Sequence, residues 1–190
     1  VRETSLAPDP ALELIYGGDV TWQSAFLISR DGRRTAIVGH FDSENVRALE
    51  AYEVVPYHEG IGAPLLAALA AHAPRAIAVN FSENDVAADG LSHGMYRLLE
   101  RYLANSPWAG KLVSAADIIY ALRGRKSAAE VERVRLAVAT TERVFDEIER
   151  FARPGMTQRE IGAFVHDLID SLGLGYAWPK PFNPIVTCGP

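Results

Sequence analysis

The sequence predicts an α/β fold in which a mixed-sheet domain is followed by a second region that begins with two helices. Strand-like and helix-like segments alternate over the first 114 residues, the order expected of an α/β layer. Two apolar stretches within 25–41 flank Asp31-Gly32, a pair that tolerates the positive φ of a tight hairpin. After about residue 125 the pattern changes to long amphipathic helices.

The elements of the first region follow from their local patterns. We predict an antiparallel hairpin within 25–41, and then a short helix through Tyr52 capped by Asp42 or Ser43. The further predicted elements are a strand over 53–57, a helix over 62–73 that stops before Pro74, an inner strand over 75–81, a helix over 92–103 and a short strand over 112–114.

Two capping boxes mark the helices of the second region. Ser127 with Glu130 and Thr157 with Glu160 each place a hydroxyl and a carboxylate three residues apart, as a reciprocal helix cap requires. The helices should form a hairpin, and their broad apolar faces indicate that both lie on a sheet. One strand, 185–187, is predicted to follow, and a single strand cannot make that sheet. We therefore expect the sequence to be incomplete at its end, and also at its front.

The composition excludes several classes of protein. A formal charge of −5 and a pI near 5.5 argue against a nucleic-acid binder, because neutralising phosphates needs a basic surface. The single cysteine, Cys188, excludes an intramolecular disulfide and a Cys-rich zinc module; we expect it to be buried and inert. No apolar run approaches the length of a membrane span and no signal-peptide core is visible, so a cytoplasmic protein is expected.

Candidate ligands are sparse. Asp85, Asp89 and His93 recur every four residues and would align on an unbroken helix, but Gly90 and Ser92 interrupt that helix, so turn and cap roles are favoured over a metal site. His40, His58 and His72 are isolated and are interpreted as structural or exposed. His166 and Asp167 are interpreted as surface residues and not as a catalytic pair, because adjacent residues of a helix do not face one another.

Two further features have a functional and a structural interpretation. Trp22, in the loop before the hairpin, is a possible ligand-facing aromatic, although core packing is the commoner fate. The basic residues Arg123, Arg125 and Lys126 could contact an anion, but a solvated linker that pairs with the next helix turn is favoured. From the residues alone, no catalytic set assembles.

A resemblance to a known family suggests a function that the spacing of residues does not reveal. The stretch "ALRGRKSAAEVERVRLAVATTERVFDEIERFARPGMTQREI" resembles the entry into the catalytic domain of the pita-bread metallopeptidases, the family of Xaa-Pro aminopeptidases, prolidases and creatinase. "PIVTCGP" resembles the first inner strand of that domain and its Gly-Pro turn, and "YGG" with "AIAVNFSENDVAADGLSHGMY" resembles parts of the family's amino-terminal domain. The implied organisation is a creatinase-like amino-terminal domain over 1–114, a linker helix and loop over 115–126, and the start of an α+β pita-bread domain over 127–190.

The resemblance implies a chemistry located beyond this sequence. The family's two Asp, one His and two Glu ligands hold two divalent ions, manganese, cobalt or zinc, and all of them follow the Gly-Pro turn. No catalytic or metal residue is therefore carried onto this chain, which is expected to be inactive alone. The implied reaction of the intact enzyme is hydrolysis of the bond preceding proline in a peptide substrate, by a homodimer. From the composition, neither a nucleic acid nor a membrane is expected as a partner. Asp19 and Trp22 are the candidates for a wall of the substrate mouth.

Two alternatives stay open. A creatinase-like C–N hydrolase would share the fold without the peptidase ligands. A stand-alone dimerisation or binding module would fold without any metal.

Overall fold

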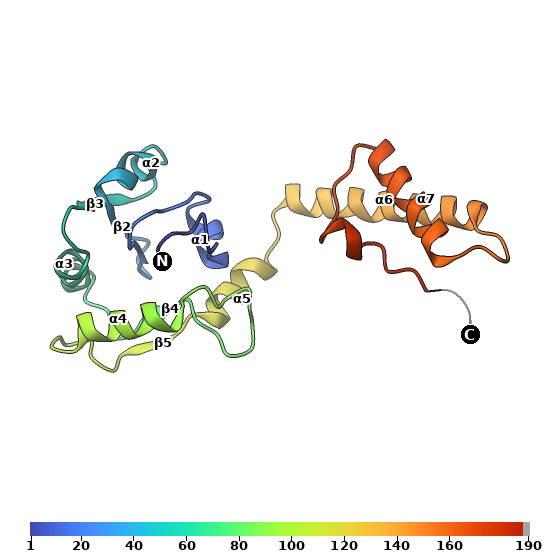
Figure 1. The fold of residues 1–190 in the computed structure, drawn as a ribbon. Helices are drawn as coiled ribbons and strands as arrows, with labels where there is room; N and C mark the ends of the chain where they lie inside the picture. The colour runs from blue at the N-terminus through green and yellow to red at the C-terminus, as the bar shows by residue number, and fades with distance from the viewer. Residues whose placement is uncertain (188–190) are drawn as a thin grey trace. The chain divides into compact units, whose positions relative to one another are not determined.

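The computed structural model describes residues 1–187 and divides the chain into two compact units, Val1–Arg125 and Lys126–Pro190. The division lies next to the expected start of the second region at residue 127. Cys188, expected to be buried, lies outside the described residues. Each unit is described by itself (Figure 1).

Unit 1 contains five helices and five strands of regular structure, plus one 3-10 turn. In chain order they are α1 Pro10–Ile15, β1 Ala25–Ile28, β2 Arg34–Gly39, η1 His40–Asp42, α2 Ser43–Arg47, β3 Glu53–Tyr57, α3 Gly62–His72, β4 Ile77–Val79, α4 His93–Leu103, β5 Leu112–Ser114 and α5 Ala116–Gly124.

The predicted mixed sheet is present. β1 pairs antiparallel with β2, and β2 pairs parallel with β3, with Ile37 opposite Val55. Gly32 has φ +87° in the hairpin turn, a conformation that glycine adopts without strain. The mixed α/β character and the hairpin are thus confirmed.

The inner strand predicted over 75–81 is shorter than expected and does not belong to the three-stranded mixed sheet. Its middle forms β4, which pairs parallel with β5 as a separate two-stranded sheet. Beyond β4 the chain turns, because the carbonyl of Asn80 accepts the N–H groups of Gly90 and Leu91 rather than those of a neighbouring strand.

The core of unit 1 lies on both faces of β2. Ile37 points into one cluster and Ala36 and Val38 into another, so the central strand is apolar on both sides. α3 and α4 cover the first face, whose buried members are Ile37, Tyr57, Ile61, Leu65, Leu69, Leu103 and Trp108.

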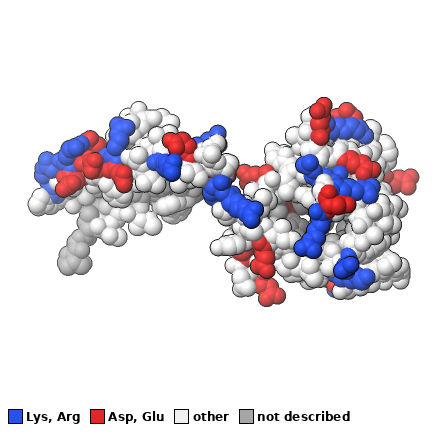
Figure 2. Space-filling view, turned by 180° about the vertical axis from the view of Figure 1, so that it is seen from behind, with Lys and Arg blue, Asp and Glu red and all other residues white. Residues whose placement is uncertain are grey.

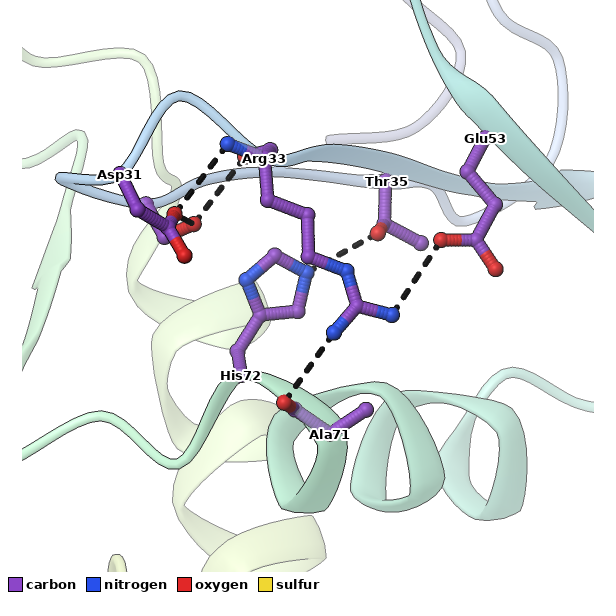
Figure 3. Close-up of polar contacts among 7 residues, drawn as sticks. Asp31, Arg33, Thr35, Glu53, Ala71 and His72 are labelled. Atoms are coloured by element: carbon purple, nitrogen blue, oxygen red, sulfur yellow. Dashed lines mark hydrogen bonds and ion pairs between the residues drawn. The ribbon is translucent and has the colours of Figure 1, made fainter.

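The last turn of α3 is tied to the sheet by polar contacts (Figure 3). The Arg33 guanidinium donates to the carbonyl of Ala71 at 3.1 Å and to the Glu53 carboxylate at 3.4 Å. His72 Nε2 lies 2.9 Å from the Thr35 hydroxyl. Because the final carbonyls of a helix lack intrahelical donors, the Arg33 contact completes this helix end. His72 is therefore structural, as predicted.

Unit 2 is a helical hairpin followed by an irregular segment. Its elements are α6 Ala128–Phe151, α7 Gln158–Ser171 and the 3-10 turn η2 Lys180–Phe182. Both predicted capping boxes form, with Ser127 and Thr157 as the caps. The rings of Phe151 and Phe164 stack 4.0 Å apart where the two helices meet, which confirms the hairpin.

Little of the apolar surface of unit 2 is covered. Among its described residues, Val165 is the only buried hydrophobic side chain. α6 exposes the apolar side chains of Val134, Val138 and Phe145. The helices are therefore amphipathic as predicted, but the sheet expected beneath them is not among the described residues.

The predicted strand over 185–187 does not form. Ile185 is exposed, and no ladder partner is found for this segment within the described part of the chain. A strand needs hydrogen bonds from a neighbour, so β-forming residues alone leave the segment irregular.

Lys and Arg side chains are interspersed with Asp and Glu on the face shown in Figure 2.

Within residues 1–187 no helix combines the length and apolarity that a membrane span requires.

Gly90 gives a test of packing in unit 1. A Cβ at this position would lie 2.3 Å from Asp9 Cγ, and the Asp9 carboxylate is held because it caps α1 and accepts from Asn80. We expect Gly90→Ala to lower the free energy of unfolding by about 1–3 kcal/mol, the usual cost of overpacking. Chemical denaturation measures the change.

Gly94→Ala is the matched control. A Cβ at Gly94 meets nothing within 4 Å, and the residue lies in the first turn of α4. Its substitution should leave stability equal or raise it by up to about 1 kcal/mol, since alanine favours helix. Equal losses in both variants would show that the close approach of Gly90 to Asp9 is not a constraint.

Candidate functional site

The loop before β1 is fixed by hydrogen bonds to three separate elements. The Asp42 carboxylate accepts the backbone N–H groups of Thr21 at 3.1 Å and Trp22 at 3.2 Å. The Tyr57 hydroxyl donates to the Gln23 carbonyl at 2.7 Å, and the Tyr102 hydroxyl donates to the Gln23 side chain at 3.2 Å. The backbone of residues 21–23 is therefore preorganised rather than free to adapt.

Asp42 performs this role instead of the predicted one. Its side chain makes no capping bond to α2, which ends at Arg47 rather than near Tyr52. Asp42 is buried, so its carboxylate needs donors, and the two loop N–H groups supply them. Asp42, one of the two residues predicted to cap that helix, is instead the anchor of the candidate loop.

Trp22 packs against the core with part of its ring and reaches the surface with the rest. Its ring packs against Gly39, where an added Cβ would lie 2.7 Å from Trp22 Cε3. It meets Tyr57 at 5.9 Å and Phe41 edge-on at 5.6 Å between centroids. Trp22 is only half-buried and Phe41 is 77% exposed, so these two rings form an aromatic platform that reaches the surface.

Asp19 belongs to the same loop but has other contacts. Its carboxylate is exposed and accepts from the Thr4 hydroxyl at 3.1 Å. The Thr4 oxygen in turn accepts the N–H of Val20 at 2.8 Å. The structure thus gives the two predicted mouth residues separate contacts: Asp19 is held by Thr4, and Trp22 by the rings around it.

Two histidines that the sequence presented as isolated are brought together. The rings of His40 and His58 stack with centroids 4.5 Å apart and an interplanar angle of 30°. His40 also meets Phe41 at 5.8 Å, so the pair continues the aromatic platform. The available signal was that His58 directly follows the strand predicted over 53–57 and that His40 lies near the end of the predicted hairpin, but the parallel pairing that brings them together was not predicted.

The other predicted polar groups serve turns or packing. Asp85 accepts the N–H of Ala87, and Asp89 accepts the N–H of Ser82, as the turn interpretation predicts. His93 begins α4. Among the described residues, no group of three or more His, Cys, Asp or Glu side chains is placed to hold a metal ion.

In unit 2, His166 differs from its predicted surface role. It is half-buried, and its Nε2 lies 2.8 Å from the carbonyl of Asn183, while its ring meets Tyr176 edge-on. Asp167 is exposed, as predicted. His166 therefore attaches the segment after α7 to the helix.

The groups of the platform form no nucleophile–base pair. Aromatic faces and edges accept apolar rings, and the stacked imidazoles add nitrogen ligands and hydrogen-bonding groups. A preorganised, partly exposed aromatic surface at the ends of parallel strands is suited to recognition of an apolar or ring-containing ligand.

The comparisons with known proteins found likeness in structure only. No protein-family model matches the sequence, and no curated protein matches it either. An Xaa-Pro dipeptidase from Bacillus anthracis is similar over 85% of this chain, with TM-score 0.54 and 16% identity. An X-Pro aminopeptidase from Thermotoga maritima MSB8 is similar over 90% of this chain, with TM-score 0.53 and 20% identity.

These likenesses establish the fold. The chain shares a fold with parts of two Xaa-Pro peptidases, in agreement with the resemblance found in its sequence. It spans 42% and 45% of the lengths of those two chains.

The pKa of Tyr57 provides a test of the hydrogen bond by which Tyr57 holds the candidate loop at Gln23. Burial, with smaller contributions from Tyr102 and Asp42, raises this pKa from 10.0 to about 12. The unfolded chain therefore loses the Tyr57 proton at lower pH than the folded protein does. We expect the free energy of unfolding to fall as pH rises from 10 to 12, because the phenolate would face the Gln23 carbonyl.

Chemical denaturation in that range measures the effect, with Tyr57→Phe as the comparison. The variant removes the titrating hydroxyl, so its stability should decline less steeply with pH. A decline as steep as that of the unmodified protein would show that Tyr57 is not the group responsible.

Proposed function

We propose that this chain is the amino-terminal portion of a metal-dependent Xaa-Pro peptidase, in which unit 1 forms one wall of the substrate mouth. The observation that carries the proposal is the likeness in fold to two Xaa-Pro peptidases over 85% and 90% of the chain. The sequence motifs around the two capping boxes point to the same family independently of the coordinates.

The contribution proposed for unit 1 is binding. Trp22 and Phe41 present ring surfaces that suit the apolar pyrrolidine ring of a proline-containing peptide. Because Asp42 fixes the Trp22 backbone, this surface requires little ordering when a peptide binds. Asp19, exposed on the same loop, adds a negative charge that favours a peptide's free amino group.

The metal centre of such an enzyme is not assigned to this chain. A two-metal hydrolase needs several carboxylate and imidazole ligands, and the described residues place no three of them together. The residues present do not fit that centre. The metals and the bond-breaking groups are proposed to lie in the remainder of the enzyme, so this chain alone is proposed to be inactive.

The helical hairpin of unit 2 is proposed as the start of the catalytic domain. Val134, Val138 and Phe145 expose the apolar side of α6, a surface that a sheet would cover. A homodimer is also proposed, in which unit 1 borders the mouth of its own or the neighbouring subunit. A stand-alone dimerisation module is the second candidate, favoured by the same exposed face of α6.

The variant Trp22→Ala, made in the complete peptidase that contains this chain, tests whether unit 1 forms a wall of the substrate mouth. We expect KM for an Xaa-Pro peptide to rise about two- to tenfold, the equivalent of the 0.5–1.5 kcal/mol typical of an aromatic contact. The rise in KM should exceed any fall in kcat, since Trp22 binds and does not react. Steady-state kinetics with a proline peptide measure both parameters.

Val86→Ala is the control, because Val86 is exposed outside the platform. If Trp22→Ala and Val86→Ala both have the kinetics of the unmodified complete peptidase, the proposal that Trp22 lies at the substrate mouth is wrong. A complete protein with no activity on Xaa-Pro peptides would contradict the enzyme assignment itself.

A further inference from the structure

The topology of the sheet brings two histidines to one edge. β2 and β3 are parallel neighbours in register, with Gly39 opposite Tyr57. His40 and His58 are therefore the first residues beyond the carboxyl ends of adjacent strands. In α/β sheets, that edge is where ligands most often bind.

The two side chains are close enough to share a ligand. The ring centroids lie 4.5 Å apart, and both residues are exposed. Two imidazole nitrogens on one tetrahedral ion, each at about 2.0–2.1 Å, lie roughly 3.4 Å from each other. Stacked rings direct their in-plane nitrogen lone pairs side by side and not at one point, so both exposed side chains must rotate out of the stack to bring one nitrogen of each ring to this spacing.

The backbone around the pair is held in place. The carbonyl of His40 accepts from the Ser43 hydroxyl at 2.7 Å, and Ser43 is fully buried. Tyr57, immediately before His58, is anchored by its bond to Gln23. Two ligands on fixed backbones lose less conformational freedom on binding than two on mobile loops.

We propose that His40 and His58 form a two-histidine site for a divalent transition-metal ion that prefers imidazole ligands, such as zinc or nickel. Neutral imidazole is a common ligand of these ions, whereas magnesium prefers oxygen. Because no third His, Cys, Asp or Glu joins the pair among the described residues, water or an external donor completes the coordination. The site lies in unit 1 and uses none of the ligands of the proposed catalytic centre.

Titration of the chain with zinc alone, and separately with nickel alone, tests the site by calorimetry. We expect saturable binding of one ion per chain and none of magnesium. His40→Gln and His58→Gln should each weaken binding by about 10- to 100-fold or more, since loss of even an outer partner of a metal ligand has that effect. His93→Gln is the matched control, because His93 is exposed at the start of α4, and it should bind like the unmodified chain.

A second measurement identifies the ligands directly. In proton–nitrogen spectra of the imidazoles, zinc should shift or broaden the resonances of His40 and His58 and leave those of His93 unchanged. Thermal unfolding of the variants checks that they fold. The proposal is overturned if the unmodified chain shows no saturable binding, or if the double variant His40→Gln/His58→Gln binds zinc equally well.

Discussion

The candidate site depends on one buried carboxylate. Asp42 is enclosed where β2 ends, and it accepts the N–H groups of Thr21 and Trp22 from a loop twenty residues earlier in the chain. An ionised side chain in that position is stable only with donors, and the loop N–H groups need acceptors equally. The end of the central strand and the loop before β1 therefore hold each other in place.

The aromatic platform follows from this constraint. With its backbone fixed, Trp22 lies over Gly39, where the absence of a side chain leaves room for the indole. Phe41 then meets the indole edge-on, and His40 and His58 extend the surface along the carboxyl ends of β2 and β3. The Asp42 contacts fix the backbone at Trp22, and the parallel register of β2 and β3 adds His58, so the surface unites rings that are up to 36 residues apart in the sequence, the interval from Trp22 to His58.

Local patterns predicted much of the fold. The hairpin at Asp31-Gly32 and the capping boxes at Ser127 and Thr157 are correct because the relevant hydrogen bonds form within a few residues. The strand predicted over 185–187 was wrong because strand formation requires a distant partner, which no short sequence pattern specifies.

The site was less predictable for the same reason. Trp22 and Asp19 could be chosen from their loop, but the role of Asp42 and the pairing of His40 with His58 depend on parallel strand register. A carboxylate before a helix has the same local signature whether it caps that helix or binds a remote loop. Only the tertiary arrangement distinguishes the two.

Amide hydrogen exchange of Thr21 and Trp22, in the unmodified chain and in Asp42→Ala, tests the central constraint most directly. The account predicts that these two amides lose protection in the variant by about tenfold or more, as expected when a hydrogen bond to a charged group worth 1.5–3 kcal/mol is removed, while the amide of Ile37 in β2 remains protected. Unchanged exchange of Thr21 and Trp22 in a folded Asp42→Ala variant would contradict it.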